Sequence, residues 1–375
     1  MQLVKQFLCI IMGAIAIGPL HLLAQEAAIS DKKATRETIQ LHHHLKILLN
    51  RGFMFGHQDD LAYGVGWQYE VDRSDIKEVT GDYPAVYGWE LGHLELDSSN
   101  NLDGVPFNAI RSFIKTTYQR GGVNTISWHF TNALTGKSAW DVVPNSVAAI
   151  LPGGAKHAQY KTWLNKLAAF FLSLKGKDGE AIPVIFRPFH EWNGSWFWWG
   201  KTGCTASEFI QLYQFTVTYL RDIKNVHNLL YAFNSDRFKD RAAYLERFPG
   251  AEWVDILGFD IYQRGNNNAQ FVQELDQSLS TLAQIAETFH KIPALTEFGY
   301  NEIPDSSWWA QCLLKAIGTH TISYILGWRN AGKKENGFEY YVPYRGQVSA
   351  PDFIEFYKDR RSLFQSDITK ENLYH

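Results

Sequence analysis

The sequence of 375 residues contains few cysteines and no excess of charge of either sign. Three cysteines are too few for a disulfide framework, and their spacing resembles no metal site. Lysine and arginine number 36 against 39 aspartates and glutamates, so no basic field is available for nucleic acid or anionic lipid. No Pro- or Ser-rich linker interrupts the chain, and we therefore expect one main domain.

An apolar run lies at the N-terminus. Lys5 precedes the apolar residues 7–17, which are few for a membrane span, and Leu22 and Ala24 fit a signal-peptidase site. We interpret residues 1–24 as a signal peptide and residues 25–375 as the mature domain of an exported protein, periplasmic or secreted. We expect no integral membrane span after cleavage, and a monomer; a plain membrane anchor is the alternative interpretation.

What the sequence has in abundance is aromatic residues, at 15%, with 13 Trp, 18 Tyr and 24 Phe. Two interpretations are open at this stage. The rings are either core residues or platforms for a flat ligand with an apolar face, of which a sugar ring is the commonest example.

Eight short runs of β-branched and aromatic residues alternate with helical patterns, which predicts a single (β/α)8 barrel. Most of the runs are almost continuously apolar, as strands buried on both faces should be. A doubly wound open sheet is the alternative, but no G-x-G-x-x-G follows any of the runs. The eight predicted strands are residues 53–58, 84–90, 124–130, 183–191, 228–234, 254–262, 293–300 and 322–330.

Three helices are predicted from apolar stripes at helical spacing. One stripe covers residues 163–174, a second covers 209–220, and a third covers 271–289. Thr205 and Glu208 form a capping-box pattern before the second stripe. In a barrel, Cys204 and Cys312 then lie on helices far apart around the ring, so we expect no disulfide between them.

Polar residues gather at the predicted C-terminal ends of the strands, where barrel enzymes carry their active sites. These residues are His57, Asp59, Glu90, His93, His129, Glu191, Asp260, Tyr262, Glu297, Trp328 and Arg329.

Two of these residues are glutamates at the ends of the fourth and seventh predicted strands. Glu191 and Glu297 should converge on one cleft that is also lined by Trp192, Trp196, Trp198, Trp199 and Trp328. Glycoside hydrolysis needs such a pair, because one acid protonates the leaving oxygen while the other attacks the anomeric carbon. A structural ion pair with Arg187 or Arg329 is the alternative role for either glutamate.

The motifs RPFHEWNGSWFWWG (187–200), TEFG (296–299) and GHQDDLAYG (56–64) resemble glycoside hydrolase family 26, chiefly β-mannanases. The first motif is the most specific, and His190 stands where related families of this clan have Asn. The resemblance implies a retaining endo-β-1,4-mannanase that acts by double displacement on mannan, glucomannan or galactomannan, with no cofactor and no metal.

The resemblance also implies a role for each residue of the site. Glu191 is the acid–base, with a raised pKa, and Glu297 is the ionised nucleophile, which Tyr262 hydrogen-bonds. The remaining residues bind sugar: Trp328 under the −1 ring, His129 and His190 on its hydroxyls, Trp196 on the leaving-group side, and Arg329 and Glu90 at the −2 ring.

Other functions remain open. Family 26 also contains exo-acting mannobiohydrolases and enzymes that cut mixed-linkage glucans or xylans, and residues 98–103 and 264–268 are the loops we expect to separate endo from exo action. From other classes come a metal-dependent hydrolase, using His57, Asp59, His93 and His129, and a non-catalytic sugar-binding barrel. No H-x-H or H-E-x-x-H supports the metal site, and we expect His42, His43 and His44 on a solvated helix face.

Overall fold

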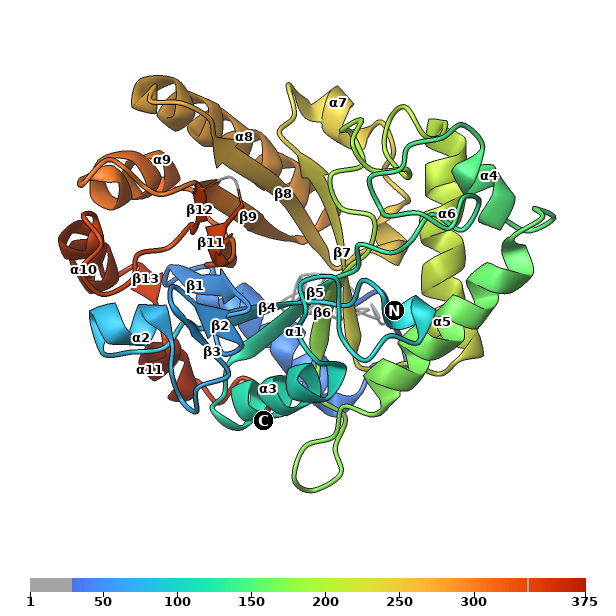
Figure 1. Cartoon of the computed structure of the whole chain (residues 1–375), viewed down its shortest axis with the longest axis horizontal. Helices are drawn as coiled ribbons and strands as arrows, with labels where there is room; N and C mark the ends of the chain where they lie inside the picture. The colour runs from blue at the N-terminus through green and yellow to red at the C-terminus, as the bar shows by residue number, and fades with distance from the viewer. Residues whose placement is uncertain (1–28, 336) are drawn as a thin grey trace, which may run out of the picture.

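The computed structural model describes residues 29–335 and 337–375, so the proposed signal peptide lies outside the described residues. Eight parallel strands form its centre, and each corresponds to one of the eight predicted runs (Figure 1). The barrel strands in chain order are β1 (Phe53–Gln58), β4 (Val86–Glu90), β5 (Val123–Ser127), β6 (Val184–Arg187), β7 (Leu229–Asp236), β8 (Ile256–Gln263), β9 (Ile292–Tyr300) and β10 (Tyr324–Gly327).

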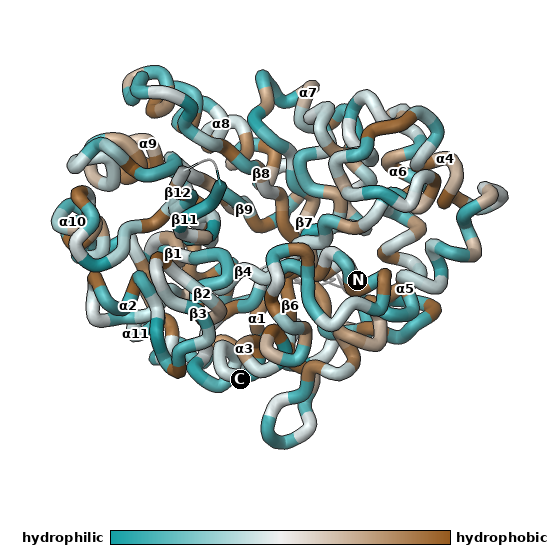
Figure 2. The backbone as a smooth tube through the Cα atoms, viewed as in Figure 1, coloured by the Kyte–Doolittle hydropathy of each residue, from teal (hydrophilic) through white to brown (hydrophobic). Residues whose placement is uncertain are grey.

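The sheet closes on itself, which confirms the predicted (β/α)8 barrel. Each strand pairs in parallel with the next one along the ring, and β10 pairs back onto β1, with Met54 opposite Tyr324 and Gly56 opposite Leu326. A short strand, β13 (Ser362–Leu363), pairs in parallel with the first two residues of β1. The tube in Figure 2 is brown mainly along the central strands and teal along many outer loops, as burial of the strands on both faces requires.

Helices surround the strands (Figure 1), and three of them lie on the predicted apolar stripes: α5, α6 and α8. The capping box before α6 is present, because Thr205 accepts from the amide of Glu208 and Glu208 accepts in return. The helices are α1 (Arg36–Leu48), α2 (Asp75–Thr80), α3 (Phe107–Gln119), α4 (Ser146–Ile150), α5 (His157–Leu172), α6 (Ala206–Thr218), α7 (Arg241–Leu245), α8 (Asn268–Phe289), α9 (Lys315–Ile317), α10 (Ala350–Lys358) and α11 (Gln365–Thr369).

Two small hairpins, β2 (Tyr63–Gly64) with β3 (Trp67–Gln68) and β11 (Gly332–Lys334) with β12 (Gly337–Glu339), add to the barrel. They follow β1 and β10 respectively, so they belong to loops after the C-terminal ends of strands. Neither hairpin was predicted from the sequence, because strands this short carry no clear alternation of apolar and polar residues.

One expectation about the first helix is wrong. His42 is 7% exposed and lies on the inner face of α1, where burial, followed by the charges of Lys46 and Lys291, lowers its pKa to about 3. His43 is exposed and His44 is half-buried, so only part of the His42–His44 run has the solvated position that was expected.

Both ends of the described chain are fixed at the end of the barrel where the strands begin. The amide and hydroxyl of Ser30 donate to the carboxylate of Asp255, which directly precedes β8. The hydroxyl of Tyr374 donates to the carbonyl of Gly122, which directly precedes β5, at 2.6 Å. Cys204 and Cys312 are both free thiols. Among the described residues, no helix combines the length and hydropathy that a bilayer crossing requires.

Candidate active site

A cavity of about 640 Å³ lies at the C-terminal ends of the barrel strands. Seven of the nine predicted site residues line it: His129, His190, Glu191, Trp196, Tyr262, Glu297 and Trp328. The cavity is also lined by six residues that the sequence did not single out as site residues: Trp140, Phe197, Asp236, Arg237, Arg264 and Tyr341.

Glu297 belongs to β9, and two groups fix its carboxylate. Nη2 of Arg187 donates to Oε1 at 2.6 Å, and the hydroxyl of Tyr262 donates to Oε2 at 2.7 Å. Burial and the charge of Glu297 raise the pKa of Tyr262 well above its usual value, so the phenol keeps the proton that it donates. Glu297 therefore forms an ion pair with Arg187 and also lines the cavity, two roles that the sequence left as alternatives.

The glycine of the TEFG motif has a steric role beside this carboxylate. A Cβ atom on Gly299 would lie 2.4 Å from Cδ1 of Tyr341 and 2.8 Å from Cδ1 of Tyr262. Only a residue without a side chain lets these two rings pack over β9, and Tyr262 needs that position to reach Glu297.

Glu191 follows β6 on a strained turn. The predicted strand over residues 183–191 ends at Arg187, because Phe189 and Glu191 take left-handed backbone angles, with φ of 55° and 53°. Such strain is common where a side chain must be aimed into a site. Nε1 of Trp196 donates to Oε2 of Glu191 at 2.6 Å. Burial, followed by the charges of Asp260 and Glu297, raises the pKa of Glu191 well above its usual value, in the predicted direction.

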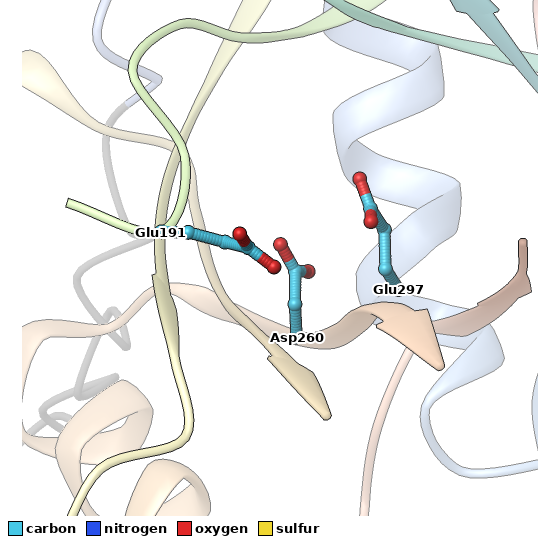
Figure 3. Close-up of side chains that lie close together, drawn as sticks. All are labelled: Glu191, Asp260 and Glu297. Atoms are coloured by element: carbon cyan, nitrogen blue, oxygen red, sulfur yellow. The ribbon is translucent and has the colours of Figure 1, made fainter. Parts of the chain in front are cut away.

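A third carboxylate lies with the two glutamates. One oxygen each of Glu191, Asp260 and Glu297 lies within 4.8 Å of the others, and Figure 3 shows Asp260 between the two glutamates. The sequence placed Asp260 at a strand end but did not include it in the site. The family resemblance assigned a role to Tyr262, two residues further along the chain, and none to Asp260.

Two histidines form another wall of the cavity. The rings of His129 and His190 meet edge to face with centroids 4.4 Å apart, and both lie about 5.1 Å from the ring of Phe197. Burial, followed by the charges of His129 and Arg187, lowers the pKa of His190 well below its usual value, so His190 is a neutral imidazole. Trp140 stacks on the outer side of His129 at 5.4 Å.

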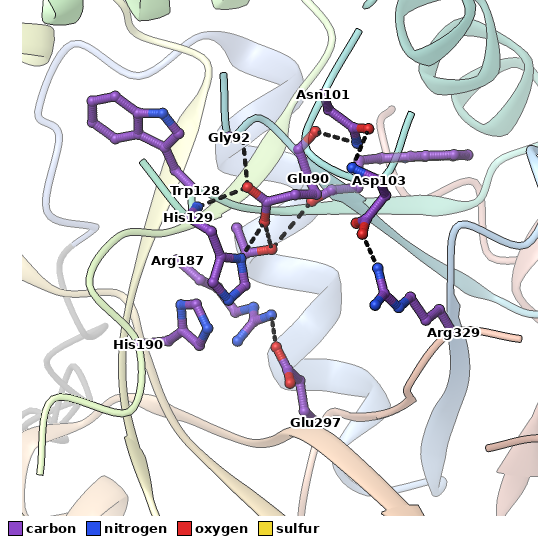
Figure 4. Close-up of polar contacts among 12 residues, drawn as sticks. Glu90, Gly92, Asn101, Asp103, Trp128, His129, Arg187, His190, Glu297 and Arg329 are labelled. Atoms are coloured by element: carbon purple, nitrogen blue, oxygen red, sulfur yellow. Dashed lines mark hydrogen bonds and ion pairs between the residues drawn. The ribbon is translucent and has the colours of Figure 1, made fainter. Parts of the chain in front are cut away.

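Glu90, which was expected at the −2 ring, lies behind the cavity wall. Glu90 is 1% exposed and does not line the cavity, and Figure 4 shows its carboxylate turned to His129. Oε1 accepts from the amides of Gly92 and His129, while Oε2 accepts from the Ser127 hydroxyl at 2.6 Å and lies 2.8 Å from Nδ1 of His129. Four contacts leave no free oxygen position for a ligand, so Glu90 supports His129.

Arg329 lies in a neighbouring cavity of about 500 Å³, together with Tyr63, Trp67 and Asp103. Its guanidinium bonds to Asp103, in the loop after β4 (Figure 4), and its Nε donates to Glu339 of β12 at 2.8 Å. We call this three-residue contact the Arg329 bridge. Its Cζ atom is 6.0 Å from the centre of the Trp328 ring, so the two cavities adjoin at this pair.

The tryptophan-rich loop is divided between core and cavity. Trp192, Trp198 and Trp199 are fully buried and do not line the cavity, contrary to the expectation, whereas Trp196 is 36% exposed within it. Trp199 stacks on Phe130 and on Phe197, so the buried rings support the aromatic wall from behind.

The histidines proposed for a metal site do not come together. Nδ1 of His57 bonds to Asp60 at 2.7 Å and His129 bonds to Glu90, while His93 precedes a short turn in the loop after β4. Within the described part of the chain, the only group of three residues that could hold a metal ion is Glu191, Asp260 and Glu297.

A closed (β/α)8 barrel defines a class of glycoside hydrolase when facing carboxyl groups, one just after its fourth strand and one on its seventh, share an aromatic cavity. Residues 30–311 match the sequence model of glycosyl hydrolase family 26, and the chain belongs to that family.

Several characterised proteins are similar to the chain. A mannan endo-1,4-β-mannosidase of Bifidobacterium adolescentis is 34% identical over 90% of this chain and 35% of its own length. The structure of a family 26 β-mannanase from Bacteroides ovatus is 43% identical, covers 91% of this chain and 98% of its own, and superposes with a TM-score of 0.87. The catalytic domain of an endo-β-1,4-mannanase from Bacillus sp. JAMB-750 is 35% identical, with coverage of 92% and 96% and a TM-score of 0.85.

The chain spans only part of the length of the curated relatives that it matches. It spans about a third of the Bifidobacterium protein and a little over half of a Bacillus subtilis mannan endo-1,4-β-mannosidase, at 35% and 57% of their lengths. The family match over residues 30–311 includes both glutamates and seven of the eight barrel strands, and it ends before β10, Trp328 and Tyr341.

Proposed function

We propose that this protein is a retaining endo-β-1,4-mannanase that hydrolyses internal bonds of mannan, glucomannan or galactomannan. The observation that carries the proposal is the short separation, within 4.8 Å, of carboxylate oxygens of Glu191 and Glu297 in unlike surroundings. Retaining glycosidases hold their two carboxyl groups roughly 5 Å apart, whereas inverting enzymes need about 6.5–9.5 Å to admit a water molecule. The similarity to mannan endo-1,4-β-mannosidases and to a family 26 β-mannanase supports mannan as the substrate.

The first chemical step uses the two glutamates in complementary states. Oε2 or Oε1 of Glu297 attacks the anomeric carbon, the bond from that carbon to the glycosidic oxygen breaks, and Glu191 gives its proton to that oxygen. Arg187 and Tyr262 keep Glu297 oriented for the attack. A buried, protonated Glu191 beside the indole of Trp196 can supply the proton at neutral pH.

The second step returns both groups to their starting states. Glu191, now a carboxylate, takes a proton from water as the water attacks the glycosyl carbon, and the bond to Glu297 breaks. Two displacements at one carbon leave the product with the configuration of the substrate.

The remaining cavity residues receive proposed roles from their positions. Trp328 supports the −1 ring by stacking, His129 and His190 bind its hydroxyls, and Trp196 borders the leaving-group side. His129 can present Nε2 to a hydroxyl because Nδ1 is held by Glu90.

Substitution of each glutamate tests the division of labour. With an aryl mannoside that has an acidic leaving group, Glu191→Ala should keep much of the first step, and added azide should restore turnover as a β-azide of retained configuration. Glu297→Ala should lose the first step with every leaving group, and azide should give at most an inverted α-product. NMR of the two mixtures decides the assignment, because a retained product from Glu297→Ala means that the roles are reversed.

We also propose that the protein is exported to the periplasm or the medium after cleavage behind Ala24. The charged, apolar and small-residue pattern of residues 1–24 supports this proposal. Amino-terminal sequencing of the protein from fractionated cells is the test. A chain that retains residues 1–24 in the membrane fraction would contradict it.

A further inference from the structure

Asp260 is a buried acid at the centre of the site with no part in the mechanism above. It is 0% exposed, and its Oδ1 accepts from the Thr296 hydroxyl at 2.8 Å. Its Oδ2 accepts no hydrogen bond from the described residues and lies 3.7 Å from Nη1 of Arg187. An aspartate that served only the fold would be expected to have both oxygens bonded.

The charges around Asp260 do not balance if all three acids are ionised. Arg187 is the one buried guanidinium among the described groups at this point, and its two short bonds go to Glu297 and to Oδ1 of Asn234, both at 2.6 Å. Glu191 has only the neutral indole of Trp196 as a bonded partner. Two buried acids of the same charge, close together and without a cation of their own, cannot both be ionised at low cost.

We propose that Asp260 and Glu191 form a proton-sharing pair in which Asp260 acts as a positioning residue that keeps the proton on the pair until the glycosidic oxygen takes it from Glu191. The inference rests on the proposed function for the identity of the acceptor, but not for the existence of the pair. The geometry in Figure 3 supports it, because Asp260 reaches toward the carboxyl group of Glu191.

The electrostatic environment points the same way. Burial and then the charge of Glu297 raise the pKa of Asp260 well above its usual value, although Arg187 opposes this. For Glu191, the charge of Asp260 is the largest influence after burial, ahead of Glu297 and Asp236. The ionisable groups that bear on the pair are Arg187, Asp236, Tyr244, Tyr262, Glu297 and Tyr324.

Titration of the carboxyl carbons by NMR tests the pair without substrate. Protein labelled with ¹³C at the carboxyl carbons of Asp and Glu is titrated as the wild type and as Asp260→Asn, Asp260→Glu and Asp236→Asn, and Glu191→Gln assigns the Glu191 signal. In Asp260→Asn, the pKa of Glu191 should fall by about one unit or more, because the neighbouring charge is gone. Asp260→Glu should keep it high, and Asp236→Asn should lower it less than Asp260→Asn does.

Two results would overturn the pair. One is a Glu191 titration that is the same in Asp260→Asn as in the wild type, or that moves as far in Asp236→Asn. The other result comes from the wild type alone, and so can be obtained even if the Asp260 variants fail to fold. In the wild type, the carboxyl carbon of Asp260 should titrate well above the usual range of aspartate. Full ionisation of Asp260 near pH 4 contradicts the proposal.

The pH profile of kcat/KM on mannan links the pair to catalysis. The alkaline limb, where the acid loses its proton, should move to lower pH in Asp260→Asn and return toward the wild-type position in Asp260→Glu. If the NMR shifts occur in a protein that does not cleave mannan, the proton-sharing pair stands and the proposed function fails. An alkaline limb that stays in place while the NMR pKa falls would overturn the positioning role.

Discussion

Glu90 and His129 illustrate how one buried carboxylate can orient a neighbouring imidazole. Burial alone would raise the pKa of Glu90, but the charge and hydrogen bonds of His129, together with the Ser127 hydroxyl, hold it at about 2. The ring of His129 is thereby fixed with Nδ1 on the carboxylate and its other edge toward His190 and the cavity.

Replacing Glu90 with Gln should therefore impair both stability and activity. A pKa of about 2 in place of 4.5 corresponds to about 3 kcal/mol of stabilisation, present above about pH 5 and lost as the pH falls from 4.5 toward 2. Denaturant unfolding of wild type and Glu90→Gln should show a gap that closes over this range.

In the same variant, kcat/KM should fall by roughly tenfold or more, because the imidazole loses its fixed orientation. Unchanged kinetics in a destabilised variant would show that Glu90 serves the fold alone.

Trp328 tests the aromatic platform. Its side chain is half-buried and lines the cavity, so Trp328→Ala should lower kcat/KM on all mannan substrates to a similar extent, since the stacking contact with the −1 ring is lost. Thermal unfolding should remain cooperative. Loss of the cooperative transition would identify Trp328 as a core residue and place the platform elsewhere.

At the scale of secondary-structure elements, the Arg329 bridge is a long-range contact between two loops that follow barrel strands. It joins the loop after β4 to the hairpin of β11 and β12, across the junction of the two cavities. Asn101 holds the base of the loop after β4 by donating to the carbonyl of Glu90, and Asn301 holds β12 by donating to the carbonyl of Phe338. The bridge therefore mainly fixes Asp103 and Glu339 relative to each other.

Arg329→Ala should loosen these loops without disturbing the barrel. Amide hydrogen exchange should accelerate in residues 98–105 and in β12, while Tm falls by no more than about 3 °C, because partly exposed ion pairs contribute about 0–1 kcal/mol. Arg345→Ala, an exposed residue of a neighbouring loop, is the matched control. Protection unchanged in both segments would mean that the bridge does not hold them.

The sequence predicted all eight barrel strands because strands buried on both faces are continuous apolar runs. It also predicted that two glutamates would meet in one cleft, because both come late in such a run or directly after it. Strand ends were less certain: residues 183–191 read as one strand, but the left-handed angles of Phe189 and Glu191 end β6 at Arg187. Left-handed backbone angles cannot be recognised from the spacing of apolar residues in the sequence.

The rest of the site depends on which way each side chain turns. Trp196 and Trp199 lie in the same tryptophan-rich loop, and no sequence pattern distinguishes them. Nevertheless, Trp196 lines the cavity and Trp199 is buried in the core. Glu90 ends β4 and Asp260 lies in the second half of β8, and only the three-dimensional contacts separate a support for His129 from a partner of Glu191. Trp140 comes from a long loop with no motif at all.

For the molecule as a whole, the C-terminal residues contribute to stability far from the cavity. Leu373 and Tyr374 are 1% and 4% exposed, and the ring of Tyr374 lies 4.5 Å from that of Tyr118. Deletion of residues 373–375 should lower Tm by roughly 6–12 °C through the loss of buried contacts, while kcat/KM at 25 °C stays unchanged. Deletion of the exposed His375 alone is the control. A loss of kcat/KM in still-folded protein would contradict this separation of stability from activity.

The attachment of both ends of the described part of the chain to one rim of the barrel has a practical consequence for handling the enzyme on a solid support. Ser30 and Tyr374 bond next to the first residues of β8 and β5, whereas substrate enters at the opposite rim. A bead, a surface or a carrier protein joined through either end would therefore face away from the polymer, and a long insoluble fibre could approach the open rim without steric interference. Orientation on a surface is thus set by the fold itself, with no need for an engineered attachment point.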